Sequence, residues 1–145
     1  MAIKEWKQLD IIKNCRNILI EYEIIVFAYV FGSYVSGKLR NDSDIDIAIY
    51  LNNQMSTDEY LDLKMKLTTA SKREVDLIIL NSATPLLKFE IYKKHILLFT
   101  RDEIEESNFK VKTLFEYNDV KRYLELSYRR NIDRLKKEIL EWKRY

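Results

Sequence analysis

The sequence predicts an α/β fold, with a core over residues 1–100 and a helical extension over residues 101–145. Two observations predict the core: segments with helical periodicity alternate with short β-branched segments, and the two glycines of the chain fall within one loop while its one proline opens a helix. A third observation predicts the extension, because its apolar residues recur among many charged ones.

The first two elements are predicted to be a helix and a buried strand. In residues 6–22, apolar side chains recur at helical spacing between charged neighbours, which indicates an amphipathic helix that covers a sheet. Residues 24–31 are β-branched and aromatic, almost without polar residues, as in a central strand buried on both faces. Gly32 and Ser33 end this strand.

The next strand alternates between acidic and apolar residues. Residues 44–51 begin Asp, Ile, Asp, Ile, and this period of two predicts a strand whose two faces meet different environments. Asp44 and Asp46 therefore share a face. Ser56 followed by Glu59 is a capping-box pattern, so we expect a helix from there to about Lys72.

Two short strands joined by a helix complete the predicted core. Residues 75–80 form the third strand, and residues 96–100 form the fourth. Between them, Thr84-Pro85 opens a helix that continues to about Lys94, because proline at the first helical position gives up only a donor that would be unpaired. Residues 109–145 are predicted as one long helix or two broken ones, whose aromatic side chains either pack onto the core or form a protein interface.

Bulk composition excludes several classes of function. Lys and Arg number 25 against 23 Asp and Glu, and the net charge of +2 gives no general coat for nucleic acid or for an anionic membrane. The single cysteine, Cys15, forms no internal disulfide, and one histidine leaves no Cys/His metal site. The longest apolar run, residues 24–31, is far shorter than the roughly 20 residues that span a bilayer. We therefore expect a cytoplasmic protein without a membrane span or an export signal.

Three aspartates and a Gly-Ser pair indicate a site for a metal and a phosphate. Residues i and i+2 of a strand lie roughly 6.5 Å apart, so Asp44 and Asp46 can share one Mg²⁺ or two neighbouring ions. Asp76 interrupts an otherwise apolar strand, where a carboxylate is costly unless it is paired or metal-bound. Gly32 lets backbone approach a ligand, and Ser33 adds a hydroxyl beside amides that suit a phosphate. Each feature alone is common outside catalytic sites, so the prediction depends on their joint order.

These residues resemble the signature of the DNA polymerase β nucleotidyltransferase superfamily. Gly32-Ser33 precede Asp44-x-Asp46 by ten residues, and Asp76 follows in a later strand. The short chain and residues 31–48 resemble the minimal nucleotidyltransferases in particular, and the resemblance extends to Phe99. It implies a mixed sheet flanked by helices.

The resemblance also implies how the site works. Asp44 and Asp46 would hold two Mg²⁺ ions, and Asp76 would complete the acceptor-side metal site and help to deprotonate the attacking hydroxyl. ATP is the implied substrate. The implied nucleotide-binding residues are Gly32, Ser33, Lys38 and Ser43.

The loop departs from the family pattern at one place. The family commonly has Gly-Ser-x-Ala-Arg-Gly, whereas Val35 and Ser36 stand here in place of Ala and Arg, so a phosphate-facing cation is missing at that position. We expect Lys38 or Arg40 to take its place. If neither does so, a binding role without catalysis is favoured.

The implied acceptor is another protein, because 145 residues leave no room for the acceptor-binding domain of larger members. Minimal nucleotidyltransferases often pair with a small helical HEPN ribonuclease and act as the antitoxin that adenylylates a toxin tyrosine, which implies a hetero-oligomer and neither a nucleic-acid substrate nor a membrane partner. Two alternatives remain, a non-catalytic antitoxin that acts by contact and an aminoglycoside-type nucleotidyltransferase. The many cations of residues 121–137 count against a cationic drug as substrate.

Overall fold

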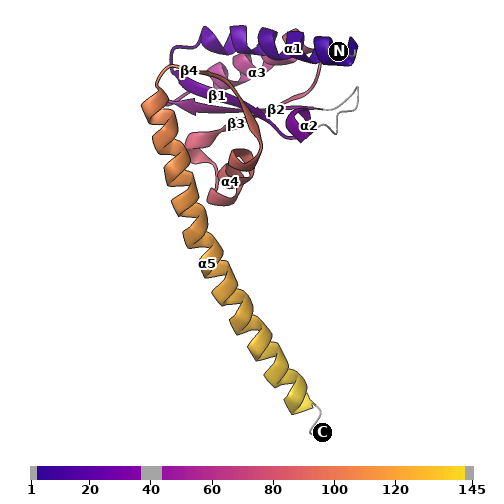
Figure 1. Cartoon of the computed structure of the whole chain (residues 1–145), viewed down its shortest axis with the longest axis vertical. Helices are drawn as coiled ribbons and strands as arrows, with labels where there is room; N and C mark the ends of the chain where they lie inside the picture. The colour runs from indigo at the N-terminus through magenta and orange to yellow at the C-terminus, as the bar shows by residue number, and fades with distance from the viewer. Residues whose placement is uncertain (1–2, 37–43, 143–145) are drawn as a thin grey trace.

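The computed structural model describes residues 3–36 and 44–142 of the chain (Figure 1). Helices and strands follow one another in the order that the sequence predicts. The helical elements are α1 (Ile3–Ile20), α2 (Ser33–Ser36), α3 (Thr57–Ser71), the 3₁₀ turn η1 (Leu80–Ser82), α4 (Pro85–Lys93) and α5 (Glu103–Trp142). The strands are β1 (Ile25–Phe31), β2 (Ile45–Leu51), β3 (Val75–Ile79) and β4 (His95–Thr100).

The four strands form one mixed sheet in the order β3-β2-β1-β4. β1 runs antiparallel to both of its neighbours, whereas β2 and β3 are parallel. The α/β fold with a mixed sheet is therefore confirmed, and so is the central position of β1, which is buried from Ile25 to Val30. β3, which carries Asp76, forms one edge of the sheet.

Helices cover both faces of the sheet and divide the core into two parts. On one face, Cys15 and Leu19 of α1 and Leu63 and Leu67 of α3 pack against strand residues such as Ile47. On the other face, α4 and the start of α5 pack against β1 and β2. In Figure 1, α1 and α3 lie above the sheet and α4 lies below it. The sheet is thus held between two apolar layers.

Local capping explains where two of the helices begin. The Ser56 hydroxyl accepts a hydrogen bond from the Glu59 amide at 3.1 Å, as the capping-box pattern predicts. Thr84 does the same for the Leu87 amide at 3.2 Å, with Pro85 at the first helical position. Each cap fixes the chain direction at a helix that flanks β3.

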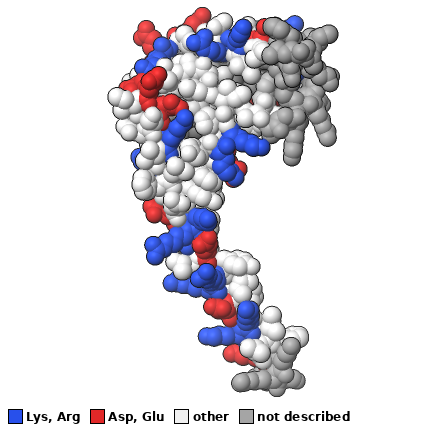
Figure 2. All heavy atoms as spheres, viewed as in Figure 1, with Lys and Arg blue, Asp and Glu red and all other residues white. Residues whose placement is uncertain are grey.

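Helix α5 is one continuous helix of 40 residues, so the alternative of two broken helices is wrong. Its first turns pack against α4 and the sheet, and Glu106 and Thr113 are buried there. The rest of α5 projects away from the body (Figure 1) and carries Lys, Arg, Asp and Glu side chains along its length (Figure 2). None of the helices in the described ranges combines the length and apolarity needed to cross a membrane.

Candidate active site

Two of the predicted aspartates lie side by side on neighbouring strands. Asp46 of β2 and Asp76 of β3 are partners in the parallel register. Asp44 immediately precedes β2 and is exposed, as Asp76 is, whereas Asp46 is half-buried. All three carboxylates therefore belong to the end of the sheet where β1 ends and β2 and β3 begin.

The three carboxylates interact electrostatically. Burial raises the pKa of the Asp46 carboxyl, and the charges of Asp76 and then Asp44 raise it further. No three acidic, histidine or cysteine side chains of the described residues already converge as the ligands of a metal ion do. The three carboxylates nevertheless fit a divalent cation, because such an ion offsets the repulsion between them. Their hard oxygen atoms are the ligands that suit Mg²⁺.

Gly32 lies directly against Asp46. The strand register pairs Phe31 with Asp46, and Gly32 follows with φ of +72°, in the left-handed region that favours glycine. A Cβ atom at this position would stand 2.0 Å from the Asp46 Oδ2 atom. The sequence predicted a close approach of the Gly32 backbone to a ligand, and the structure shows a close approach to the carboxylate itself.

Residues that follow Gly32 turn the chain into α2. Ser33 begins this helix and is half-buried, and the Val35 amide donates to the Gly32 carbonyl at 3.1 Å. The structure thus brings Gly32 and Ser33 to the same end of the sheet as the three aspartates. Three other predicted loop residues, Lys38, Arg40 and Ser43, lie outside the described residues.

The sequence did not reveal what anchors α2. Tyr34 is 7% exposed, and its ring lies under the Arg73 guanidinium, whose Cζ atom is 5.5 Å from the ring centroid. Burial raises the pKa of the Tyr34 hydroxyl, and the Arg73 charge opposes that rise. The sequence did contain one indication of this anchor, an aromatic residue directly after Gly-Ser, because a large apolar ring at the start of a helix usually packs against the core.

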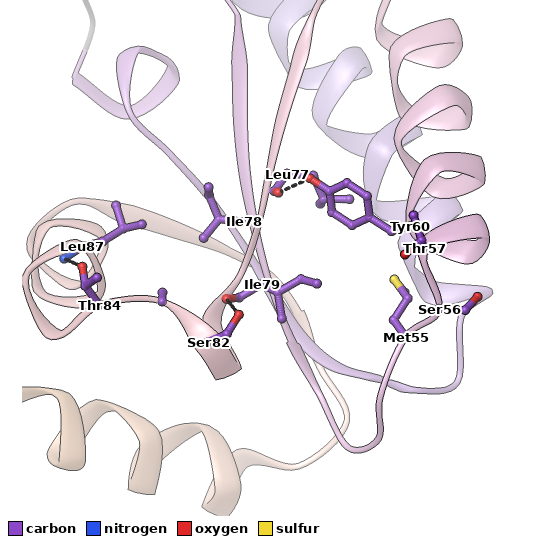
Figure 3. Close-up of a pocket in the computed structure, with 11 residues that line it drawn as sticks. Met55, Ser56, Thr57, Tyr60, Leu77, Ile78, Ile79, Ser82, Thr84 and Leu87 are labelled. Atoms are coloured by element: carbon purple, nitrogen blue, oxygen red, sulfur yellow. Dashed lines mark hydrogen bonds between the residues drawn. The ribbon is translucent and has the colours of Figure 1, made fainter.

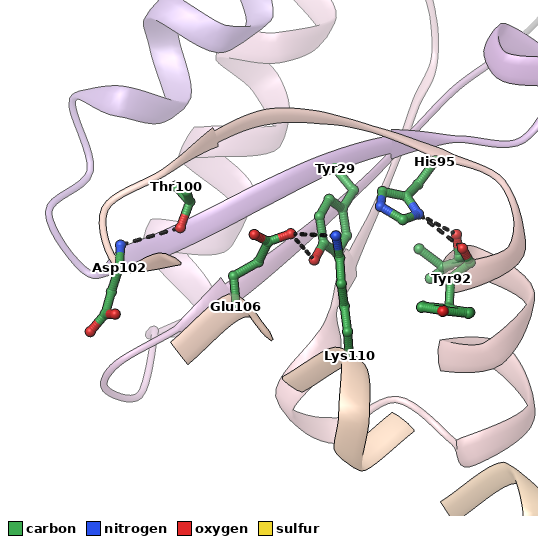
Figure 4. Close-up of polar contacts among 8 residues, drawn as sticks. Tyr29, Tyr92, His95, Thr100, Asp102, Glu106 and Lys110 are labelled. Carbon is green, nitrogen blue, oxygen red and sulfur yellow. Dashed lines mark hydrogen bonds and ion pairs between the residues drawn. The ribbon is translucent and has the colours of Figure 1, made fainter. Parts of the chain in front are cut away.

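A second polar cluster was also missed, and it joins α5 to the sheet (Figure 4). The Tyr29 hydroxyl of β1 donates to Glu106 Oε1 at 2.8 Å, and the Lys110 ammonium lies 3.0 Å from the same oxygen. The His95 ring packs against Tyr29, and its Nδ1 lies 3.0 Å from the Tyr92 carbonyl oxygen. Glu106 stands in a run of charged residues, so only its spacing of four from Lys110 indicated a pair.

Comparison with known proteins finds one family along most of the chain. The family model described as Polymerase beta, Nucleotidyltransferase matches residues 13–104. The protein adenylyltransferase MntA of Shewanella oneidensis is 32% identical over 115 residues, which cover 79% of this chain and 80% of that protein.

Solved structures extend the similarity into α5. A chain from the crystal structure of a toxin-antitoxin with AMP-PNP matches with a TM-score of 0.65 and 26% identity, over 83% of this chain and 97% of that one. A chain from the structure of the tri-AMPylated Shewanella oneidensis HEPN toxin in complex with MNT antitoxin has a TM-score of 0.62 and 26% identity, over 92% of this chain and 98% of that one. Because residues 1–104 are less than 92% of the chain, the match includes part of α5.

Proposed function

The chain belongs to the polymerase β nucleotidyltransferase family, and from that membership we propose that it transfers AMP from ATP to a tyrosine hydroxyl of a HEPN ribonuclease toxin and so acts as an antitoxin. The observation that carries this proposal is the pairing of Asp46 with Asp76 across two strands, with Asp44 and Gly32 beside them. Similarity to a protein adenylyltransferase and to a complex of an antitoxin with a tri-AMPylated toxin supports the choice of acceptor.

In the proposed reaction, one bond to phosphorus forms and one breaks. The tyrosine oxygen attacks the α-phosphorus of ATP, the bond from this phosphorus to the bridging oxygen breaks, and pyrophosphate leaves. The phenolic proton passes to the carboxylate of Asp76, which lies on the outermost strand. The product is a tyrosine that carries AMP.

The remaining site residues bind and orient the nucleotide in this proposal. Asp44, Asp46 and Asp76 would hold Mg²⁺, two ions by analogy with the family, and a bound metal neutralises charge on the phosphates. Gly32 and Ser33 would contact the terminal phosphates, together with Lys38 and Ser43. Catalysis then comes mainly from positioning the reactants for an in-line attack.

The deciding experiment measures the intact mass of the HEPN partner after incubation with this protein, ATP and Mg²⁺. We expect one or more added AMP units and reduced ribonuclease activity. Asp44→Asn should abolish both effects, whereas Asp62→Asn, a matched change on the exposed surface of α3, should leave both intact. If Asp44→Asn neutralises the toxin as well as the wild type does and no mass shift is seen, the protein acts by contact and the proposal is wrong.

A separate measurement addresses the metal. Titration calorimetry with ATP should show binding in Mg²⁺ that is lost when a chelator is added, because two carboxylates on one strand face repel the phosphates until a cation neutralises them. Equal affinity with and without the metal would contradict the role given to Mg²⁺. We also propose a cytoplasmic location, which fits a substrate such as ATP and the free thiol of Cys15.

A further inference from the structure

The outer edge of β3 offers backbone groups to another chain. The Ile45 amide donates to the Glu74 carbonyl, so Glu74 and, by alternation, Asp76 and Ile78 direct their backbone groups toward β2. Leu77 and Ile79 must therefore direct theirs outward. The Tyr60 hydroxyl, which donates to the outward Leu77 carbonyl at 2.7 Å, agrees with this orientation. The Ser82 hydroxyl likewise donates to the Ile79 carbonyl at 3.5 Å, so a strand that adds to this edge would bond the outward amides and share these two carbonyls with the hydroxyls.

A hollow of about 540 Å³ lies along this same edge (Figure 3). Met55 and Tyr60 approach it from the α3 side, and Thr84 and Leu87 approach it from the α4 side, with Ile78 and Ile79 of β3 between them. Among the described residues, its lining contains hydroxyl and apolar groups but no Asp, Glu, Lys or Arg. A lining of this kind suits an uncharged apolar side chain and offers the phosphates of a nucleotide no cationic side chain.

The hollow and the candidate active site share strand β3. Leu77, which lines it, directly follows Asp76. The Gly32-Ser33 turn follows β1, which is two strands away from β3 in the sheet. With the triphosphate near Gly32 and Ser33, the acceptor approaches from the opposite side, where Asp76 and the β3 edge lie.

We propose that the β3 edge and its hollow form the acceptor-binding site: an extended, tyrosine-bearing segment of the partner protein adds to β3 as a further strand, and an uncharged apolar side chain of that segment fills the hollow. The inference depends on the proposed function and gives it a substrate class. The acceptor hydroxyl must be carried by a chain that can become extended.

Strand geometry sets the register of this acceptor segment. Neighbouring residues of a strand are about 3.3 Å apart and point to alternate faces. When the tyrosine lies beside Asp76, the residue two positions away shares its face and lies beside Ile78 and Leu87. The residues one and three positions away lie instead on the face of Leu77 and Ile79, toward Tyr60 and Met55.

Steady-state transfer to the HEPN partner tests the hollow. Leu87→Glu places a charge in the hollow. Leu86→Glu places the same charge on the preceding residue of α4, and Leu86 is 46% exposed and lies outside the hollow. Ser82→Trp obstructs the rim from an exposed position and so spares the core. We expect Leu87→Glu and Ser82→Trp to raise the KM for the partner about tenfold, with the KM for ATP unchanged and Leu86→Glu equal to wild type.

Amide hydrogen exchange of the complex with the partner tests the strand addition itself. The outward amides of Leu77 and Ile79 should exchange about tenfold more slowly when the partner and a non-hydrolysable ATP analogue are bound, while those of Asp76 and Ile78, already paired with β2, should change little. If the KM for the partner is unchanged in folded Ser82→Trp, or if exchange at Leu77 and Ile79 is unchanged, the inference is wrong. The proposed function still stands in that case, because the wild type transfers AMP. No transfer by the wild type overturns the proposed function and this inference with it.

Discussion

Gly32 and Asp46 are coupled through a contact that no side chain at position 32 would permit. We predict that Gly32→Ala destabilises the fold by roughly 1–2 kcal/mol, the cost of a left-handed alanine, with a further cost for moving the Asp46 carboxylate, whose Oδ2 would stand 2.0 Å from the new Cβ. Urea unfolding of a double-mutant cycle measures this. In an Asp46→Ala background the same change should cost only the backbone part, roughly 1–2 kcal/mol. Equal costs in the two backgrounds would show that the contact is relaxed in solution.

Cys15 of α1 is predicted to be chemically inert in the native protein. The thiol is 2% exposed, and burial raises its pKa to about 11. Since only the thiolate reacts, about 0.1% of the group is reactive at pH 8. Iodoacetamide at pH 8 should label almost none of the folded protein, and it should label Cys15 fully in denaturing urea. Rapid native labelling would mean that α1 separates readily from the sheet.

The sequence alone allows the positions of the acidic residues to be predicted because the signal is local. Alternation places Asp44 and Asp46 on one side of β2, and an isolated carboxylate in an apolar strand marks Asp76. The contact between Gly32 and Asp46 could not be predicted, because it depends on the antiparallel register that sets Phe31 opposite Asp46. The catalytic roles of the three aspartates stay predictions until the substitutions are assayed.

The junction of α5 with the sheet depends on a buried cluster that has an exposed counterpart elsewhere. Glu106, 6% exposed, accepts from Tyr29 and pairs with Lys110 four residues on, while Asp62 on α3 accepts from Tyr22 and pairs with Lys66 in the same spacing at the surface. Because the two clusters have the same chemistry but different burial, a comparison between them separates the effect of burial on stability from the effect of the contacts themselves.

We predict that Glu106→Ala destabilises the protein by about 2 kcal/mol, because the Tyr29 hydroxyl then stays buried without a partner. Asp62→Ala should have a much smaller effect, since water replaces the lost contacts at an exposed site. Thermal and urea unfolding of the two variants provide the comparison. Equal losses would show that burial of the Tyr29–Glu106 pair contributes nothing.

At the scale of elements, the strands and capped helices were predictable because their signals lie within a few residues of each other. Several boundaries differ from the prediction by a few residues; among them, α1 ends at Ile20, β3 ends at Ile79, and α5 begins at Glu103 inside the charged stretch. The sequence left open whether α5 is one helix or two. The residues between its apolar positions are charged residues with good helix propensity, without a glycine or proline, and they are compatible with the continuous helix that forms. Tertiary contacts, the Tyr29–Glu106 hydrogen bond and the packing of Phe109 on Phe27, show where that helix meets the sheet.

For the whole molecule, we propose that residues 1–100 form the catalytic core and residues 101–145 form an extension that is anchored at one end and free to bind a partner at the other. The anchored part contains the buried residues Glu106 and Thr113. Farther along α5, large apolar side chains remain exposed, including Tyr123, Tyr128, Ile139 and Trp142. A helix that leaves such side chains uncovered is typical of a protein interface.

Five apolar residues of this outer part follow one face of α5. Leu124, Tyr128, Leu135, Ile139 and Trp142 recur at spacings of three, four and seven, which keep them on one side of a helix. Leu126 lies about 200° away from Leu124 around the axis, near Arg122 and Arg129, yet the two leucines are almost equally exposed, at 49% and 48%. They form a matched pair for locating the interface.

We predict that Leu124→Glu weakens binding of the HEPN partner at least about tenfold, roughly 1.4 kcal/mol, because it places a charge in the apolar stripe. Leu126→Glu, the same change on the opposite face, should leave the Kd within about twofold. Calorimetric titration measures both, and unchanged melting temperatures would show that neither substitution disturbs the core. Since the outer part of α5 projects away from the sheet, Leu124→Glu should also leave ATP binding unchanged (Figure 1). A larger loss in Leu126→Glu than in Leu124→Glu would assign the partner to the cationic face, where acidic rather than apolar groups of the toxin would make the contact.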